Sequence, residues 1–278
     1  MGFPARWEKR PPWVVKYVDD VTEGGENLLQ HSTSHITTQK EHRMVHAGDL
    51  EGVFNIIEEN STKAGMVVNP KKTQLLCVTG SINYNVDSYI NLRGTRIYSS
   101  ETLRVLGMTI DSKCTMAAHV RGLKRKFSSR IWILRHLKRS RMSADDLLRM
   151  FNVYIRPTLE YACPTFHPML TGGMRDDIEM IQKRACRIIF GINMSYDVLV
   201  NDKKIETLEA RRERLTVNFA KKCANSERFK HWFVKKPETN LRRSLVFEES
   251  FARTERLKKS PLYYMRRALN NEENSVKL

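Results

Sequence analysis

The sequence lacks the features that direct a protein into or across a membrane. No apolar run is long enough to span a bilayer, and the first twelve residues lack the apolar core of a secretory signal peptide. Arg6 stands where an N-myristoylation motif requires serine or threonine. We therefore expect no membrane partner and an intracellular location, in the nucleus, the cytoplasm or both.

Cysteine is scarce and widely spaced, and no Cys-x-x-Cys pair occurs among the five residues of this type. Such spacing supports neither a zinc module nor a disulfide framework. Reduced thiols in an intracellular protein fit best. Internal repeats and low-complexity segments are also lacking. The five residues are Cys77, Cys114, Cys163, Cys186 and Cys223.

Positive charge, by contrast, is abundant. The 278 residues carry a formal net charge of +17, with 41% hydrophobic and 28% charged residues. This balance is typical of a globular protein rather than a disordered one. So much uncompensated charge favours a polyanionic partner, nucleic acid first and an anionic membrane surface second.

Two adjacent carboxylates close the first apolar segment. Trp13-Val14-Val15 leads into Lys16-Tyr17-Val18-Asp19-Asp20, and Val21-Thr22 follows. Two β-prone pieces joined in this way predict a tight hairpin with the aspartates at its tip. Because adjacent carboxylates repel each other, a partner cation is indicated, and hard oxygen ligands favour Mg²⁺. A solvated Asp-Asp turn is the alternative.

The segment that follows alternates between helix and strand patterns. A helical period covers about residues 41–64 and ends at Gly65, and strands are expected over residues 74–78 and 103–110. A hairpin about Arg93-Gly94 is expected to join residues 89–92 to residues 95–98. This order predicts an α+β fold.

Beyond residue 112 the periodicity is helical. One long helix is expected from Met116 to Leu137, with a strongly basic face opposite its apolar face. Ser143 and Asp146 resemble a capping box, and Arg156-Pro157 is expected to end the helix that they open. Further expectations are an irregular connection over residues 157–168, a helix from the cap at Thr171 to Gly191, and a helix over residues 205–223 with Leu208, Leu215 and Phe219 inward.

The basic residues of these helices could track a phosphate backbone with little sequence preference. Residues 121–140 hold eight lysines or arginines and no acid. For any single residue the alternative is an ordinary solvated helix face. The candidate nucleic-acid-binding residues are Arg121, Lys124, Arg125, Arg130, Arg135, Lys138, Arg139, Lys183, Arg184, Arg187, Arg211 and Arg212, with Arg214 beside them.

The order of these segments resembles a known family. Residues 16–20 resemble the catalytic hairpin of reverse transcriptases, residues 65–73 the lysine-bearing element that follows it, and residues 103–111 the primer-grip strand of non-LTR (LINE-type) retrotransposon enzymes. Later stretches are similar to the region after the palm in the same elements. These stretches are residues 155–162, 181–191, 208–212 and 259–261.

The resemblance implies an architecture and a chemistry. It implies a partial polymerase palm of antiparallel strands with a helix over residues 13–112, after a leader of residues 1–12. An all-α thumb over residues 113–224 and a basic C-terminal tail with short helices over residues 225–278 would follow. Such enzymes extend a DNA primer along an RNA template with deoxynucleoside triphosphates, by two-metal phosphoryl transfer with Mg²⁺.

The resemblance also implies roles for single residues. Asp19 and Asp20 would be the catalytic, metal-binding carboxylates, and Tyr17 and Val18 would lie near the primer terminus. The substrate-binding set is completed by Lys71 or Lys72 near the triphosphate, and by Leu106, Gly107 and Met108, which would brace the primer.

A two-metal polymerase site needs a further carboxylate from an earlier strand, and only Glu8 precedes the hairpin here. We therefore expect an N-terminally truncated copy that does not polymerise by itself. Two alternatives stay open: a non-catalytic nucleic-acid-binding module, and a decayed relic of a mobile element.

Overall fold

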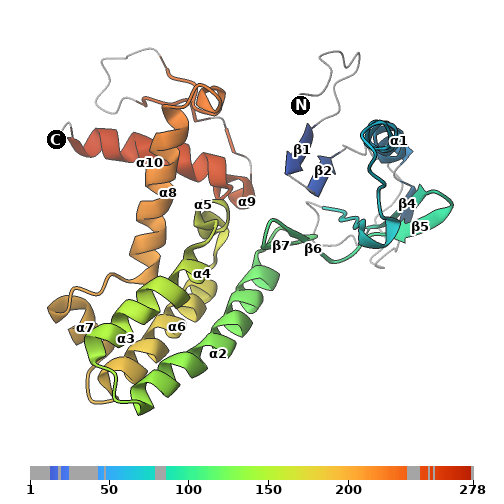
Figure 1. Ribbon diagram of the computed structural model, residues 1–278. Coiled ribbons are helices and arrows are strands. Elements are labelled where there is room, and N and C mark those ends of the chain that lie inside the picture. The colour runs from blue at the N-terminus through green and yellow to red at the C-terminus, as the bar shows by residue number, and fades with distance from the viewer. Residues whose placement is uncertain are drawn as a thin grey trace, which may run out of the picture. The chain divides into compact units, whose positions relative to one another are not determined.

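The computed structural model describes residues 13–17, 20–24, 43–46, 48–78, 86–236, 245–249, 251–252 and 254–276. Side chains are described within these ranges for residues 54–78, 89–236, 245–249, 251–252 and 254–272. Helices and strands are mixed, as an α+β fold requires, and the chain forms two compact units (Figure 1). The first unit comprises residues 1–105 and 111–114, and the second comprises residues 106–110 and 115–278.

The predicted N-terminal hairpin is present. Strands β1 (Trp13–Tyr17) and β2 (Asp20–Gly24) pair antiparallel, with Tyr17 opposite Asp20. This register leaves two residues between the strands, Val18 and Asp19, which lie outside the described residues. The hairpin therefore begins its return strand at the second of the two aspartates.

A three-stranded sheet and a helix also belong to the first unit. Strand β3 (Arg43–His46) runs parallel to β4 (Val86–Leu92), which pairs antiparallel with β5 (Thr95–Tyr98). The predicted turn at Arg93-Gly94 is confirmed, with both residues at positive φ. Helix α1 spans Gly48–Lys63, and Phe54, Leu75, Ile90 and Leu92 form the core cluster of this unit.

Two local predictions for this unit are wrong. The helical period expected from about residue 41 begins at Gly48, because residues 43–46 pair with β4 instead. The strand expected over residues 74–78 is reduced to one bridge between Leu75 and Ser99, preceded by the short 3-10 helix η1 (Pro70–Lys72). In the first place strand pairing overrides the local helical preference, and in the second the expected strand finds only a single bridging partner.

The segment expected as one strand over residues 103–110 is a hairpin. Strands β6 (Thr102–Val105) and β7 (Met108–Asp111) pair with each other. Leu106 and Gly107 form the turn between them with φ of +48° and +84°. Consecutive residues at positive φ are the signature of a two-residue hairpin turn, and Gly107 supplies the flexibility that this turn needs.

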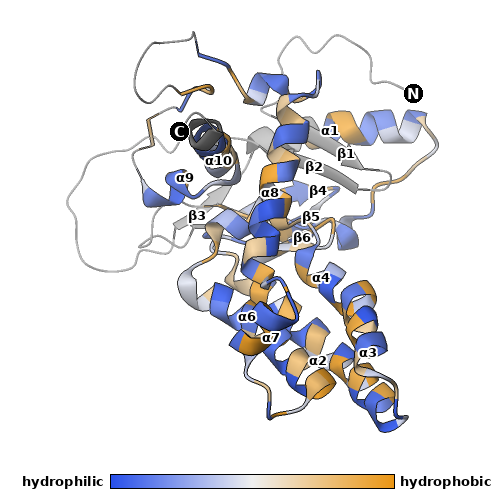
Figure 2. Cartoon of the chain, turned by 90° about the vertical axis from the view of Figure 1, so that its left-hand side faces the viewer, coloured by the Kyte–Doolittle hydropathy of each residue, from blue (hydrophilic) through white to orange (hydrophobic). Residues whose placement is uncertain are grey.

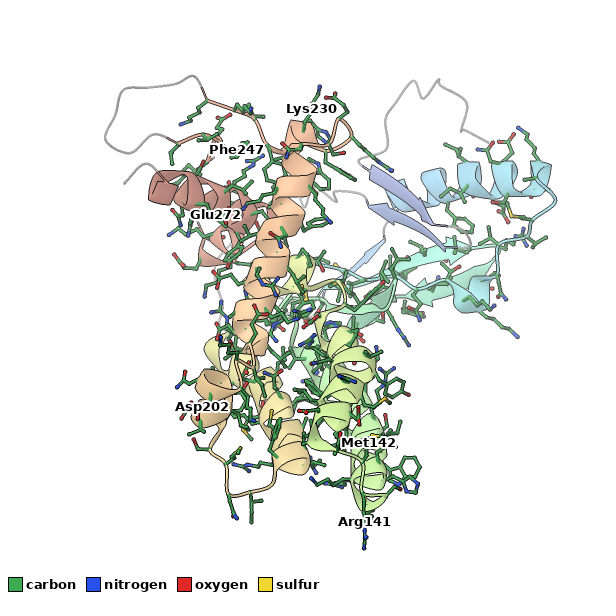
Figure 3. All side chains as sticks on the ribbon, turned by 60° about the vertical axis from the view of Figure 1, so that its left-hand side comes forward. Arg141, Met142, Asp202, Lys230, Phe247 and Glu272 are labelled. Carbon is green, nitrogen blue, oxygen red and sulfur yellow. The ribbon has the colours of Figure 1, made fainter. Side chains whose placement is uncertain are left out.

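The long basic helix is confirmed as α2 (Ala117–Arg139). Leu123, Phe127, Ile131 and Leu134 on its inner face are buried in the main core of the second unit. Figure 2 shows the alternation of hydrophobic and hydrophilic residues along α2 that this burial requires. The helix turns into α3 (Ala144–Met150) at Arg141 and Met142, both labelled in Figure 3.

Ser143 is confirmed as the N-cap of α3, but the predicted end at Arg156-Pro157 is wrong. The Ser143 hydroxyl oxygen accepts the amide of Asp146 and its hydroxyl donates to that carboxylate. Downstream, Phe151–Ile155 form a π-helical segment that runs into α4 (Arg156–Glu160). The Arg156 amide donates to the Phe151 carbonyl, five residues back. Pro157 is tolerated because it falls in the first turn of α4, where no amide donor is needed.

The remaining helices complete the second unit. The expected irregular connection over residues 157–168 is instead largely helical, in α4, α5 (Cys163–Phe166) and η3 (His167–Met169). Thr171 and Gly191 bound α6 (Gly172–Phe190) as predicted. The elements after α4 are α5 (Cys163–Phe166), η3 (His167–Met169), α6 (Gly172–Phe190), α7 (Tyr196–Asp202), α8 (Leu208–Ala224), η4 (Lys230–Trp232), α9 (Glu255–Lys258) and α10 (Pro261–Val276).

The inner face of helix α8 matches the prediction in part. Leu208 is buried and Leu215 packs against the main core, as expected, but Phe219 is 40% exposed. Instead, Arg212 and Thr216 follow Leu208 into the interior at four-residue spacing. A second core cluster forms where Ala220 of α8 meets residues of α10.

None of the helices among the described residues is long and apolar enough to cross a membrane. All five cysteines are described, and none of them is joined in a disulfide bond.

Candidate nucleic-acid interface

The proposed metal-binding hairpin is described only by its backbone. Tyr17 and Asp20 are paired across β1 and β2, and their side chains lie outside the described part, as do Val18 and Asp19 entirely. Within the part of the chain whose side chains are described, no group of three or more histidine, cysteine or acidic residues could hold a metal ion. The Mg²⁺ site at Asp19 and Asp20 thus stays a prediction.

Lys71 and Lys72 sit on a well-formed turn. The Asn69 side chain accepts the amide of Lys71 at 3.0 Å, and the Thr73 hydroxyl donates to the Asn69 carbonyl at 3.1 Å. Both lysines are exposed on η1. The turn therefore presents two ammonium groups to solvent, where an anionic ligand could reach them.

The Leu106-Gly107 turn is held on the second, helical unit by specific contacts. The Tyr161 hydroxyl donates to the Leu106 carbonyl at 2.8 Å, and the Thr165 hydroxyl donates to the sulfur of Met108. A Cβ on Gly107 would stand 3.3 Å from Cε1 of the Tyr161 ring. The three residues expected to brace a primer therefore occur together on one hairpin, and glycine permits the close approach of the tyrosine.

A buried histidine supports the same hairpin. Nδ1 of His119 lies 3.4 Å from the amide nitrogen of Thr109 and accepts its proton. The imidazole packs against Phe166 with ring centroids 4.8 Å apart. Burial and, secondarily, the charge of Lys126 hold the pKa of His119 below its usual value. The neutral form that can accept this hydrogen bond is therefore favoured.

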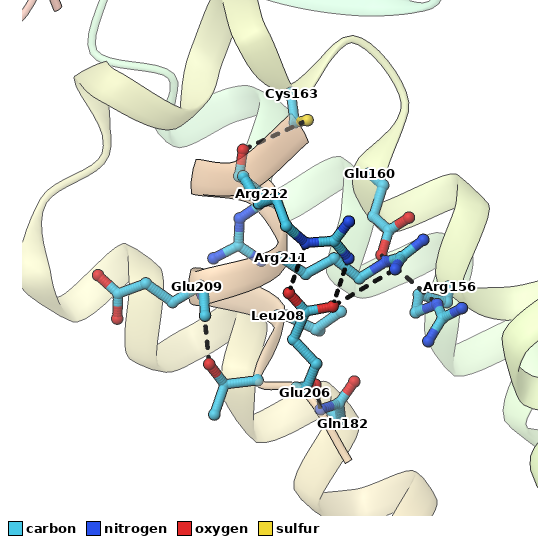
Figure 4. A network of polar contacts seen from close by, with 12 residues as sticks. Arg156, Glu160, Cys163, Gln182, Glu206, Leu208, Glu209, Arg211 and Arg212 are labelled. Atoms are coloured by element: carbon cyan, nitrogen blue, oxygen red, sulfur yellow. Dashed lines mark hydrogen bonds and ion pairs between the residues drawn. The ribbon is translucent and has the colours of Figure 1, made fainter. Parts of the chain in front are cut away.

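Arg211, expected at a nucleic-acid surface, belongs to an internal ion network (Figure 4). Its guanidinium pairs with Glu160 of α4 and, at 3.5 Å, with Glu206. Glu206 also accepts two bonds from Arg214, at 2.7 and 2.9 Å, and this pairing lowers the pKa of its carboxyl group. The network joins α4 to the start of α8, so Arg211 helps to hold these two helices together.

Arg212 does not lie on the exposed basic face, and this expectation is wrong. Its side chain has no exposed surface, and none of its guanidinium nitrogens has a hydrogen-bond partner among the described residues. The four-residue spacing from Leu208 places it on the inner face of α8. Burial lowers its pKa from the usual value, although Glu179 opposes the shift.

Three of the basic residues of α2 also make internal contacts. Lys124 pairs with Asp177 at 2.9 Å, and Lys138 donates to the Ile189 carbonyl at 2.9 Å. Arg130 donates to the Tyr154 carbonyl at 2.9 Å and lies over the Tyr154 ring. These side chains flank the apolar face and tie α2 to its neighbours.

The other four arginines form what we call the arginine stripe: Arg121, Arg125, Arg135 and Arg139. All four are exposed, and no hydrogen bond or ion pair within the described residues involves their guanidinium groups. With Ser128 and Trp132 they recur every three or four residues, which puts them on one face, opposite the buried residues. Among the described residues, the structure therefore separates cations that hold the fold from cations that make no internal ion pair.

Helix α6 contributes a smaller basic group. Lys183, Arg184 and Arg187 are all exposed. The Lys183 ammonium lies 5.2 Å from the centroid of the Tyr196 ring, whereas neither arginine makes an ion pair in the described part of the chain. The two arginines, like the stripe, are available to bind an anion.

Trp132 and His136 were not among the residues predicted from the sequence. Trp132 is 62% exposed and stacks on His136, with ring centroids 5.4 Å apart and ring planes 18° apart. The available signal was the position of Trp132, seven residues after Arg125 and seven before Arg139, opposite the apolar face.

Comparison of the chain with protein-family models, with curated proteins and with solved structures finds no match.

Proposed function

We propose that the chain binds nucleic acid through the arginine stripe, as the thumb region of a non-LTR retrotransposon reverse transcriptase holds an RNA template and its DNA primer. The observation that carries this proposal is that four exposed guanidinium groups on one face of a well-packed helix have no acidic partner among the residues whose side chains the structure describes. The reverse-transcriptase assignment rests in addition on the order of the motifs in the sequence.

The geometry of the stripe suits a polyanion. Arg121 and Arg139 are eighteen residues apart on α2, which corresponds to about 27 Å at a rise of 1.5 Å per residue. Double-stranded nucleic acid offers many phosphates over such a length. Because the helix is fixed by its apolar face, the arginines need little reorganisation of the backbone on binding.

The test is the salt dependence of binding to a labelled RNA–DNA hybrid, measured by fluorescence anisotropy. If all four arginines contact phosphates, replacing them with glutamine should reduce the slope of log affinity against log salt by about 3 to 4, at about 0.9 per contact for a DNA duplex. Circular dichroism would verify that the variant is folded.

A matched control removes the same charge elsewhere in the same unit. Lys203, Lys204, Lys222 and Arg267 are also exposed, and their replacement by glutamine should change the slope much less. An equal effect in both variants, or a flat salt response of the wild-type chain, would contradict the proposal.

Polymerase chemistry is the further part of the proposal. Asp19 and Asp20 would ligate Mg²⁺, and Lys71 or Lys72 would meet the triphosphate. Two adjacent carboxylates are few ligands for two metal ions about 3.5–4 Å apart. We therefore expect the 278-residue chain alone to bind primer–template without extending it.

Primer extension on an RNA template with Mg²⁺ tests this expectation, with Asp19→Ala as the control. Incorporation that depends on Asp19 would show that the chain polymerises unaided. Binding without incorporation agrees with the non-catalytic module as well. A broad, non-cooperative melt would instead point to a decayed relic.

A further inference from the structure

We infer that Trp132 is a stacking site for an unpaired base, so that the solvent face of α2 binds a single-stranded segment of RNA or DNA. This inference deepens the proposed function and rests on it. It assigns to α2 a preference for strands with accessible bases, which the arginines alone do not provide because phosphates are common to every nucleic acid.

One face of the indole is already supported. His136, one helical turn further on, stacks on Trp132 with ring centroids 5.4 Å apart and planes 18° apart. This contact holds the indole in one orientation, yet 62% of the residue stays exposed. An aromatic ring that is both supported and exposed is what a base needs as a platform.

The preceding turn leaves room beside the indole. Ser128 and Ser129 occupy the positions four and three residues before Trp132, where a long side chain would meet the ring. Their hydroxyl groups donate to the carbonyls of Lys124 and Lys126, at 3.0 and 2.8 Å. The turn before Trp132 therefore carries two small side chains at the neighbouring positions, both bonded to their own helix.

Charge surrounds the platform on both sides. Arg125 lies two turns before Trp132, and Arg135 and Arg139 lie one and two turns after it. A strand whose base stacks on the indole can thus place its flanking phosphates near guanidinium groups. The neighbours along this face are arginines and serines rather than apolar residues, which favours a nucleic-acid strand over an apolar protein surface.

A stacking site favours an unpaired base over a base inside a continuous duplex. Bases inside a duplex are stacked on their neighbours, and extracting one costs a few kcal/mol. An unpaired base has a free face, and stacking it on an aromatic side chain contributes about 1–3 kcal/mol. The ligand class is therefore a single-stranded segment, either free or next to a paired region.

The experiment compares oligonucleotides with equal numbers of phosphates: a twelve-residue thymidine strand, an abasic strand of the same length, and a duplex with as many phosphates in total. Wild-type chain should bind the thymidine strand about tenfold more tightly than the abasic strand, from one stacked base. Trp132→Ala should abolish this preference while leaving the salt slope unchanged. Trp132→Phe should retain most of it.

Phe251→Ala is the matched control, because Phe251 is an aromatic residue of the same unit that is 89% exposed; its removal should leave the preference intact. Equal affinity of the wild-type chain for the thymidine and abasic strands would overturn the stacking site while leaving the arginine stripe in place. Binding to none of the three ligands would overturn both proposals. A thymidine preference that survives Trp132→Ala would place the stacking elsewhere and refute the assignment of Trp132.

Discussion

Replacing Gly107 with alanine tests how tightly the Leu106-Gly107 turn is held on the helical unit. Gly107 has a φ of +84°, and an L-residue in the left-handed region costs about 1–2 kcal/mol. The new Cβ would also stand 3.3 Å from the Tyr161 ring. Displacing that ring would weaken the hydrogen bond from its hydroxyl to the Leu106 carbonyl, which contributes about 1 kcal/mol.

Removal of the tyrosine provides the matched control. In a Tyr161→Leu background, Gly107→Ala has no tyrosine ring to displace and no hydroxyl bond to weaken, so it should cost only the backbone term. We expect Gly107→Ala to lower the free energy of unfolding by about 1 kcal/mol more in the wild-type background than in the Tyr161→Leu background.

Chemical denaturation followed by circular dichroism at 222 nm measures both variants through the helical unit. Repeating the Gly107 substitution in a Tyr161→Leu background completes a double-mutant cycle, in which the excess cost should disappear. An equal cost of Gly107→Ala in the two backgrounds would refute the claim that Tyr161 holds the turn in place.

Three further predictions concern the helical unit. Glu160→Gln should destabilise it by about 2 kcal/mol, because two guanidinium groups lose a largely buried partner, whereas Glu227→Gln, at an exposed pair with Lys230, should leave the denaturation midpoint unchanged. Burial lowers the pKa of His167 to about 4, below its unfolded value of about 6.5, so its contribution to stability is present above pH 6.5 and is lost as the pH falls towards 4. That loss should reach about 3 kcal/mol in pH-dependent denaturation and vanish in His167→Gln but not in the exposed His231→Gln. In the native protein, only Cys77 and Cys114 should react quickly with maleimide. The other three thiols, of Cys163, Cys186 and Cys223, are buried and have raised pKa values. Rapid modification of a third thiol, measured by mass spectrometry, would contradict this.

The sequence predicted those elements whose signals are local. The period from Met116 to Leu137 matches α2, and the caps at Ser143 and Thr171 match the starts of α3 and α6. These signals depend on side chains three or four residues apart, which act whatever surrounds the helix.

The elements that were missed depend on partners far away in the sequence. Residues 43–46 form a strand because β4 pairs with them. Arg212 is buried and Phe219 is exposed. The amphipathic pattern of α8 indicated the opposite arrangement. Tertiary packing decides each of these cases.

The candidate site was predicted only in part for a similar reason. Charge density identified α2 as a whole, but Lys124, Arg130 and Lys138 are engaged by Asp177 and by backbone carbonyls contributed by other segments. Which cations are bound internally depends on helix packing, and the one-dimensional pattern does not contain that information. Trp132 was missed because a tryptophan on a helix is more often a core residue.

The arginine stripe has a consequence for stability as well as for binding. Arg121 and Arg125, like Arg135 and Arg139, repel each other at four-residue spacing, and each such pair costs about 0.2–0.5 kcal/mol. Added salt should screen this repulsion and so raise the free energy of unfolding of the unbound protein. The same salt weakens the binding of a polyanion. A bound nucleic acid would neutralise the repulsion between these arginines. Its binding should therefore also increase the stability of the folded protein.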